Sequence, residues 1–455
     1  MLKEAVAYYH ELLEDFQIAD ASRRELDEAL ESARLIFGGR RLSPYLRPHF
    51  VTQSDWSRVT QICETIWNAL QKVKDAALEE PKIFDELGIV GIERELVAID
   101  PKYRQVSPTA RLDSFLTENA FSFVELNGES PAGIAYADSA TEIFKNLTVM
   151  KKFCERYEIE GFEGRPKLLD VLLSAYEEFL GRKPEKNPVI AIVDLKDLPT
   201  QKEFELFRDY FEMKGYTALI CAPDELEFDG EKLYYAGVAI DIVYKRLLVN
   251  EYLPLIKAQP ALLDAYRAGA ICMVNSFRSK LVHKKAIFAV LTNEKYARLF
   301  NDAELAAIRA HIPWTRKFRE EKTFYAAQEI DLVEWTRRNN SKLVLKPNDD
   351  YGGHGIYIGW NSDEKEWNDA IQIALENGDY LVQERVETSK EIFPFVDESG
   401  SIHNLEQLVD LDPLLYDGIV GSAFTRLSSS ELANVSSGGG MVPTFIIREK
   451  EKSNK

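Results

Sequence analysis

A glycine-rich segment at residues 342–360 has residue types that suit a bound nucleotide. Alternating apolar residues at 343–345 predict a strand that ends with Lys346, whose ammonium group is a point charge for an anion. Three glycines lie in the turn after it: Gly352, Gly353 and Gly355. Glycine backbones bend at positive φ and turn several N–H groups toward one ligand. This pattern fits a cover over a bound triphosphate, and it equally fits an ordinary hairpin with an exposed lysine. Two acids in the turn, Asp349 and Asp350, are expected to point outward or to cap it.

A strand predicted at residues 121–126 carries possible metal ligands. Glu125 and Asn127 are two residues apart, so both side chains project from the same face of the strand. Asp113 lies upstream, two residues after Arg111. Two oxygen donors on one face and a carboxylate from a neighbouring segment suit Mg²⁺, which is commonly held by one or two carboxylates plus substrate phosphates. A half-exposed acidic strand in an acidic protein is the alternative.

Two arginines follow predicted strands. Alternation of strands with a helix after residue 188 predicts a small parallel sheet covered by helices. Arg246 follows the strand at 239–244, and ligands of open α/β sheets lie beyond the carboxyl ends of strands. Its planar guanidinium suits a substrate carboxylate, although a surface salt bridge is equally compatible. A strand at 419–426 delivers Arg426 in the same way.

Two more segments have groups that suit a nucleotide. A helix predicted at 280–291 has Lys284 and Lys285 near its start, where the helix dipole disfavours cations. Two lysines on a solvated face are the alternative. A strand predicted at 380–382 continues into four residues whose backbone groups could bind the edge of an adenine: Gln383, Glu384, Arg385 and Val386.

Hydrophobic periodicity predicts the remaining elements. Residues 1–80 have a helical period, with a long helix near 56–78. Residues 89–99 have a period of two and are expected to contain strand segments. Residues 302–339 are expected to be mostly helical, with a break at 312–313.

Composition defines the class of protein. A chain of 455 residues needs two or three domains. Its net charge of −19 opposes binding to nucleic acid and to anionic membranes. The four cysteines form no CxxC pair, which fits a reducing compartment. The N-terminus is an acidic amphipathic helix by pattern and not a signal peptide, and no apolar run approaches the roughly 18 residues of a membrane span. We therefore expect a cytoplasmic protein.

The order of these segments resembles the circularly permuted branch of the ATP-grasp ligases, which includes glutathionylspermidine synthase and eukaryotic-type glutathione synthetase. In most ATP-grasp proteins the Glu-x-Asn strand comes after the lysine, the glycine loop and the adenine hinge, whereas here Glu125 precedes Lys346. A family motif of the type Asn-Lys-Ala resembles the segment at 282–288, with His283 at the asparagine position and Lys284 as the better match. The resemblance covers roughly residues 86–447.

This resemblance implies a fold of class α+β or α/β, an ATP-grasp fold in circularly permuted order. We expect a small-residue loop at 428–440 to lie over the site. The expected parts are an N-terminal helical region, a metal-binding part of the core, a small α/β substrate domain, a nucleotide-binding region and a charged tail, at residues 1–85, 86–182, 183–275, 276–447 and 448–455.

The resemblance also implies ATP and Mg²⁺ as cofactors, with Arg246 orienting a substrate carboxylate. Arg111 and Arg426 would neutralise charge on an acyl-phosphate. The metal ligands would be Asp113, Glu125 and Asn127. The nucleotide would be bound by Lys284, Lys346, Gly352, Gly353, Gly355, Gln383, Glu384 and Val386.

These roles predict an ATP- and Mg²⁺-dependent carboxylate–amine ligase that acts through an acyl-phosphate on a small peptide or amino-acid-like substrate. Its partners would be small-molecule acids and amines, with no nucleic acid and no membrane. The chain has no GxxxxGK[ST] segment of a P-loop NTPase and no HRD or DFG segment of a protein kinase. A non-catalytic nucleotide-binding or scaffold protein with the same fold is the alternative, and the completeness of the residue set favours catalysis.

Overall fold

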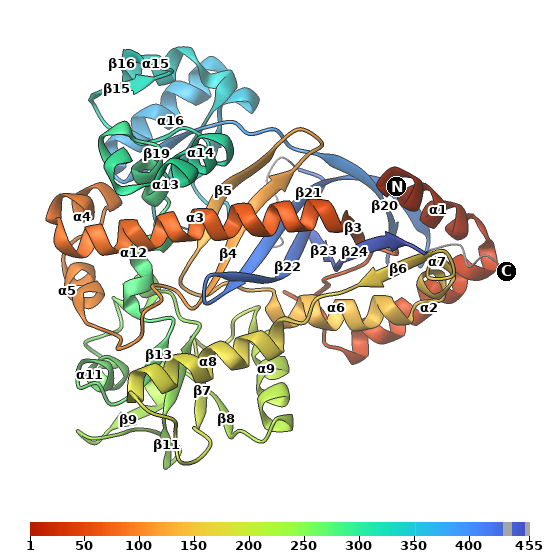
Figure 1. Ribbon diagram of the computed structural model, residues 1–455, viewed down its shortest axis with the longest axis horizontal. Coiled ribbons are helices and arrows are strands. Elements are labelled where there is room, and N and C mark those ends of the chain that lie inside the picture. The colour runs from red at the N-terminus through yellow and green to blue at the C-terminus, as the bar shows by residue number, and fades with distance from the viewer. Residues whose placement is uncertain (351, 431–438, 451–455) are drawn as a thin grey trace.

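The computed structural model describes residues 1–350, 352–430 and 439–450, and it has the mixed α/β architecture expected from the sequence (Figure 1). At its centre is a six-stranded antiparallel sheet of order β23-β22-β21-β4-β5, with β20 paired to β21. Its strands are β4 (Thr109–Leu116), β5 (Phe121–Asn127), β20 (Lys390–Val396), β21 (Ile402–Tyr416), β22 (Ile419–Ser428) and β23 (Gly440–Val442). The sheet thus joins two parts of the chain that are far apart in sequence.

The two faces of this central sheet differ in character. A long helix, α3 (Gln53–Glu79), lies along one face (Figure 1), and Thr52 caps its first turn by accepting the N–H of Asp55 at 3.0 Å. Successive residues of a strand face opposite sides, so Leu411 and Leu415 of β21 pack in the core with α3. Asp410 and Asp412 then face the other side. The face opposite α3 is therefore where charged side chains gather.

A parallel sheet of order β13-β12-β7-β8 forms a separate layer, as the strand–helix alternation predicts. Its core includes residues of every strand. A short antiparallel sheet of β9 (Leu226–Phe228), β10 (Leu233–Tyr235) and β11 (Val238–Ile240) follows β8. The elements of the parallel layer are β7 (Ile190–Val193), β8 (Ala218–Cys221), β12 (Ile242–Lys245), β13 (Cys272–Val274), α8 (Gly164–Leu180), α9 (Gln201–Met213), α10 (Val249–Tyr252) and α11 (Ala261–Arg267).

A four-stranded antiparallel sheet of order β14-β19-β17-β18 lies on the other side of the central sheet, at the top of Figure 1. Trp367 of its covering helix is 1% exposed and packs with Leu343 and Leu345 of β17. The elements of this layer are β14 (Thr315–Lys317), β17 (Leu343–Pro347), β18 (Tyr357–Ile358), β19 (Tyr380–Glu384), α15 (Leu332–Arg338), α16 (Glu364–Asn377) and the hairpin of β15 (Lys322–Tyr325) with β16 (Gln328–Asp331).

The N-terminal region is helical, as predicted, but it also supplies strands. β3 pairs in parallel with β24, which in turn pairs with β6, so the first fifty residues are tied to the end of the described chain. The elements of this part are α1 (Leu2–Glu14), α2 (Phe16–Ser32), β1 (Ile36–Phe37), β2 (Arg40–Arg41), β3 (His49–Thr52), α6 (Ile134–Asn146), α7 (Thr148–Phe153), β6 (Tyr157–Glu160) and β24 (Thr444–Glu449).

Three secondary-structure predictions are wrong. Residues 89–99 contain helix α5 (Ile92–Ala98) and no strand, because the buried positions Glu93, Leu96 and Val97 recur at helical and not alternating spacing. The helix predicted at 280–291 is two short helices, α12 (Lys280–His283) and α13 (Ala286–Leu291), with Lys284 extended between them. The segment 302–339 is helical only in α14 (Asp302–His311) and α15, and contains strands β14 to β16 in between.

The helix α4 (Pro81–Leu87) joins α3 to α5. The four cysteines form no disulfide, as predicted. None of the helices in the described part of the chain is long and apolar enough to cross a membrane. Parts of the predicted loop at 428–440 and of the predicted charged tail, residues 431–438 and 451–455, lie outside the described residues.

Candidate active site

A cavity of about 520 Å³ lies where the central sheet, the four-stranded sheet and the carboxyl edge of the parallel sheet meet. Two of the residues predicted from the sequence, Lys284 and Gly355, are not among the described residues that line it. The predicted residues that do line it are Arg111, Asp113, Glu125, Asn127, Arg246, Lys346, Gly352, Gly353, Gln383, Glu384, Val386 and Arg426. Segments separated by up to three hundred residues are thus brought together.

Two arginines converge on Asp113 at the wall formed by the central sheet. Arg111 donates from Nε and Nη2 to the two oxygens of Asp113, at 2.8 and 3.1 Å. Arg426 donates from Nη2 to Oδ2 of Asp113 at 2.6 Å. Burial alone would raise the pKa of Asp113, but the two guanidinium groups hold it below its ordinary value. Asp113 is therefore an anion fully engaged by cations of the protein.

Glu125 and Asn127 of β5 lie next to this group. In the β4–β5 register Asp113 faces Glu125 and Arg111 faces Asn127. Asn127 donates from Nδ2 to Oδ1 of Asp113 at 2.9 Å, which directs its amide oxygen elsewhere. One carboxylate and one amide oxygen on the same face fit Mg²⁺ that also takes phosphate oxygens and water. Asp113 fits less directly, because both its oxygens already accept hydrogen bonds from arginine.

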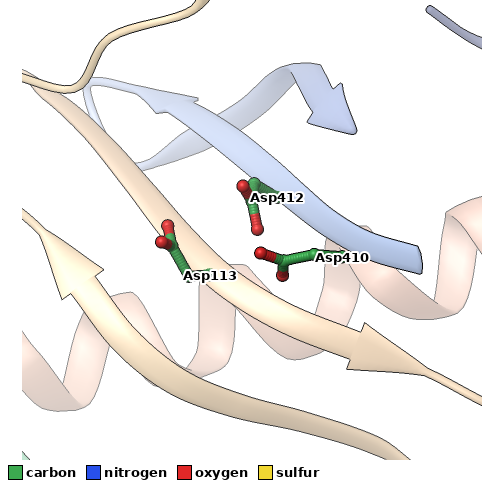
Figure 2. A group of neighbouring side chains, drawn as sticks. All are labelled: Asp113, Asp410 and Asp412. Atoms are coloured by element: carbon green, nitrogen blue, oxygen red, sulfur yellow. The ribbon is translucent and has the colours of Figure 1, made fainter. Parts of the chain in front are cut away.

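Two further acids at this wall, Asp410 and Asp412 of β21, were not identified from the sequence. Figure 2 shows their carboxylates directed toward that of Asp113, and one oxygen from each of the three lies within 4.8 Å of the others. Arg426 contacts Asp410 through Nη2 and Asp412 through Nε at 3.0 Å. The signal in the sequence is a pair of aspartates inside an otherwise apolar strand, since such residues are rarely buried without partners.

Lys346 is a cationic side chain on the cavity wall formed by the four-stranded sheet. A β-bulge in β5 at Val124 leaves the carbonyl of that residue outside the ladder, and Lys346 Nζ donates to it at 3.0 Å. The side chain is buried at the end of β17. The pKa of Lys346 is lowered to about 8, mainly by burial. Glu125 opposes this shift and nearby Lys285 adds to it. This lysine is a desolvated cation close to the cavity.

The structure separates Lys284 from its neighbour Lys285. Lys284 Nζ donates to the carbonyl of Gly88 and to Glu93, both at 2.7 Å, and lies 3.7 Å from Asp349 at the start of the glycine loop. Its charge is thus neutralised by carboxylates, and it does not line the cavity. Lys285 Nζ lies 3.6 Å from Glu125 and donates to the carbonyl of Asp350 in the glycine loop. Lys285 therefore bonds to the backbone of the glycine loop and lies beside Glu125, although neither lysine is among the described residues that line the cavity. If the Asn-Lys-Ala motif is aligned so that its Lys-Ala pair falls on Lys285 and Ala286, the motif selects Lys285.

The glycine loop has the backbone predicted from its composition. Gly352, Gly353 and Gly355 have φ of 72°, 77° and 67°, the left-handed region that favours glycine. The expectation for Asp349 is wrong, because its carboxylate points inward and binds Lys280 Nζ at 2.6 Å. Lys280 is fully buried and also pairs with Glu129 at 2.9 Å, so the start of the loop is anchored by a buried ion pair.

The predicted adenine hinge ends β19 at the rim of the cavity. Gln383 Nε2 donates to Thr315 Oγ1 at 3.0 Å, and Tyr325 Oη donates to Glu384 Oε1 at 2.6 Å. The N–H groups of Glu384 and Arg385 bond to carbonyls of neighbouring segments. The side chains of Gln383 and Glu384 are thus held in place by hydrogen bonds. The backbone groups near Val386 then remain to contact a ligand.

Arg246 is buried at the carboxyl edge of the parallel sheet and is not a surface residue. Its Nη1 donates to the carbonyl of Pro131 at 2.7 Å and to Tyr244 Oη at 3.2 Å, and its Nη2 lies 3.6 Å from Glu203. Asp194, after β7, lines the same end of the cavity, and burial raises its pKa to about 6. This end therefore offers both a guanidinium and a carboxyl group.

Comparisons with known proteins agree with this architecture. A glutathione synthetase-like effector from Globodera pallida matches with a TM-score of 0.61 and 12% sequence identity, over 95% of this chain and 98% of that one. The chain thus has the fold of this structure, which confirms the resemblance to permuted ATP-grasp proteins at the level of the fold. D-cycloserine synthetase matches over 48% of this chain and 74% of that chain at 15% identity, with a TM-score of only 0.27.

In sequence, a Frankia alni protein with a provisional assignment as glutamate–cysteine ligase 2-3 is 26% identical over 221 residues. The match covers 46% of this chain and spans about a quarter, 24%, of that relative. No family model matches the chain.

Proposed function

We propose that this protein is an ATP- and Mg²⁺-dependent ligase that joins a carboxylate to an amine. The observation that carries the proposal is the convergence of the predicted groups in one cavity. Partners for a triphosphate, for a base and for a substrate carboxylate all line it, from segments spread over residues 111–426. The likeness in fold to a glutathione synthetase-like protein, and the sequence match to a protein assigned as a ligase, support the same class.

In this proposal ATP lies between the central and four-stranded sheets. Lys346 and Lys285 bind its phosphates, together with N–H groups of the glycine loop, because a desolvated ammonium gains most from an anion placed beside it. Lys285 takes the role that the sequence suggested for Lys284. Adenine meets the backbone near Val386, because the N–H groups of Glu384 and Arg385 are already bonded within the protein. Glu125 and Asn127, with Asp113 beside them, would hold Mg²⁺, which when bound neutralises phosphate charge.

The reaction needs no protein nucleophile. A carboxylate oxygen of the acid substrate attacks the γ-phosphorus of ATP, the bond to the β-phosphate oxygen breaks, and ADP leaves. The amine nitrogen then attacks the acyl carbon of the resulting acyl-phosphate, inorganic phosphate leaves, and the nitrogen loses a proton to solvent. Arg111 and Arg426 neutralise the oxygens on which charge develops, and Arg246 orients the acid. Positioning and electrostatic stabilisation account for most of the rate in such transfers.

A screen for phosphate release from Mg·ATP with pools of acids and amines tests the proposal. A pair of substrates that produces ADP, phosphate and an amide is expected. Glu125→Ala should abolish turnover, and the same variant should weaken Mg·ATP more than metal-free ATP. Undiminished Mg·ATP binding in both Glu125→Ala and Lys346→Ala would contradict the site assignment.

The second candidate, a nucleotide-binding protein without turnover, is favoured by one observation. Both oxygens of Asp113 are bound by Arg111 and Arg426, so this carboxylate reaches a cation only after those bonds rearrange. Copurified ATP without turnover over a broad panel of acids and amines would support this second candidate over the ligase.

A further inference from the structure

The face of β21 toward the cavity carries two carboxylates that the proposed reaction does not use. Asp410 and Asp412 are 1% and 0% exposed, and because they are two residues apart they face the same side. With Asp113 they form the group of three acids in Figure 2. Burying carboxylates is costly unless cations or hydrogen bonds compensate. Something in the protein must therefore balance these charges.

Two arginines balance only part of this charge, because they face three carboxylates. Burial raises the pKa of Asp410 and that of Asp412 above the ordinary value of an aspartate, which favours their protonated forms. Arg426 binds Asp113 at 2.6 Å, contacts Asp410 through the same nitrogen, and places Nε 3.0 Å from Asp412. Arg111 Nε lies 2.8 Å from Asp113 and 3.6 Å from Asp412. Guanidinium groups thus occupy the space between the carboxylates. The cluster is arranged around arginine and not around a metal ion.

The contacts hold Arg426 from three sides. Its Nη2 donates to Asp113 and to Asp410, and these two hydrogen bonds restrict the guanidinium. Its Nε lies 3.0 Å from Asp412 as an ion pair, without the geometry of a hydrogen bond. Asp410 is also the residue directly across from Arg426 in the β21–β22 register. Among the described residues, no hydrogen bond or ion pair involves Nη1 of Arg426, and the side chain lines the cavity. A long side chain without such partners would lose rotamer freedom at the moment of binding.

We infer that Asp410 and Asp412 are positioning residues that hold Arg426 ready to bind the terminal phosphate of the nucleotide through Nη1. This inference rests on the proposed function and deepens it, because it names the residues that preorganise one of its arginines. A donor held in place before the reaction stabilises developing charge without reorganisation. Asp410 lines the cavity beside Arg426 and Asp412 does not, and in this inference both act on the nucleotide through Arg426.

Nucleotides that differ only in the terminal phosphate test this role. Asp412→Asn keeps the shape of the side chain but can no longer form an ion pair with Arg426 Nε. Dissociation constants for Mg·ADP and for Mg·AMP-PNP, an analogue with the third phosphate, are measured by calorimetry. We expect binding of Mg·AMP-PNP to weaken about tenfold, the size of one charged hydrogen bond, and that of Mg·ADP to change less than about twofold. Arg426→Ala should show the same selective loss, and the double variant no further loss.

Asp138→Asn is the matched control. Asp138 is 4% exposed and pairs with Arg165 at 3.2 Å, but it does not line the cavity, so both constants should stay unchanged. Equal weakening of the two nucleotides by Asp412→Asn, or additive losses in the double variant, would overturn the inference. So would loss of bound Mn²⁺, measured by paramagnetic resonance without nucleotide, since Asp412 would then be a metal ligand.

The inference and the proposed function can fail separately. If the wild-type protein binds both nucleotides and Arg426→Ala leaves the preference for Mg·AMP-PNP intact, the inference is wrong and the proposed function stands. If the wild-type protein binds neither nucleotide, the proposed function is wrong. In that case chemical denaturation tests the coupling between Asp412 and Arg426. The double variant of Asp412→Asn and Arg426→Met should shift the denaturation midpoint by less than the sum of the two single shifts. Additive shifts would overturn it, and Asp410→Asn replaces Asp412→Asn if that variant does not fold.

Discussion

The two walls of the cavity carry charge in opposite ways. On the central sheet, Arg111 and Arg426 are neutralised by buried aspartates within hydrogen-bonding distance. On the four-stranded sheet, the partner of Lys346 is the backbone carbonyl of Val124, and no described residue forms an ion pair with Lys346 Nζ. The cations of one wall are already paired with carboxylates before any ligand arrives, whereas the other wall has a desolvated cation that would gain from an anion.

This difference has a consequence for mutation. Removing one member of a buried ion pair leaves its partner uncompensated and destabilises the fold. Removing a buried lysine without a carboxylate partner takes away a desolvation penalty instead. Variants on the central sheet should therefore change stability and binding together, and variants at Lys346 should separate the two.

The largest effect is expected for Lys346→Met. Loss of one charge-assisted contact to phosphate should weaken Mg·ATP about a hundredfold, while the thermal midpoint of the free protein stays the same or rises. Calorimetry and thermal unfolding measure the two quantities. A lower thermal midpoint with unchanged affinity for Mg·ATP would show that Lys346 stabilises the fold as Arg111 and Arg426 do. The two walls would then not differ in this way.

The neighbouring lysines give the next effect. Lys285→Ala should weaken Mg·ATP about tenfold, because its ammonium lies near Glu125 and the glycine loop. Lys284→Ala is the matched control and should leave affinity within about twofold but lower stability, because it leaves Glu93 buried without its cation. Equal losses of affinity in both variants would contradict the separation of these two side chains.

The contrast between walls also explains what the sequence could predict. Alternation alone predicted that Glu125 and Asn127 project from one face of a strand, and both line the cavity. Their role as metal ligands stays a prediction. The sequence could not show how the side chains of Lys284 and Lys285 are directed, because this depends on a local break between α12 and α13, where Lys284 is extended.

Asp410 and Asp412 were missed for a different reason. No sequence motif links them to another site residue. They come close to Arg426 and Asp113 only because β21 pairs between β22 and β4. Similarly, the partner of Lys346 is a carbonyl freed by a bulge in β5, which depends on register between strands. Local periodicity predicts which way a side chain points but not what it meets there.

A pH dependence would sharpen the comparison further. The pKa of Lys346 is lowered to about 8, so this side chain loses its proton, and its attraction for phosphate, as pH rises through that value. Affinity for Mg·ATP should fall roughly fourfold between about pH 7 and pH 8.5, as the protonated fraction of the free protein falls. Calorimetry across this range measures it. Lys346→Arg keeps its charge and should show a flat profile, and a slope that persists in this variant would exclude Lys346 as its origin.

The smallest effect is expected at the one carboxylate of the hinge. Tyr325 Oη donates to Glu384 at 2.6 Å, and this hydrogen bond is the main reason that the pKa of Tyr325 is raised to about 12. If adenine is bound by the backbone of the hinge, Tyr325→Phe frees the Glu384 side chain without touching the base. Affinity for Mg·ATP should then change about twofold or less, since the lost bond is partly exposed. A tenfold loss would mean that the side chain of Glu384 binds the base, and that this wall, like the central sheet, is organised by a paired carboxylate.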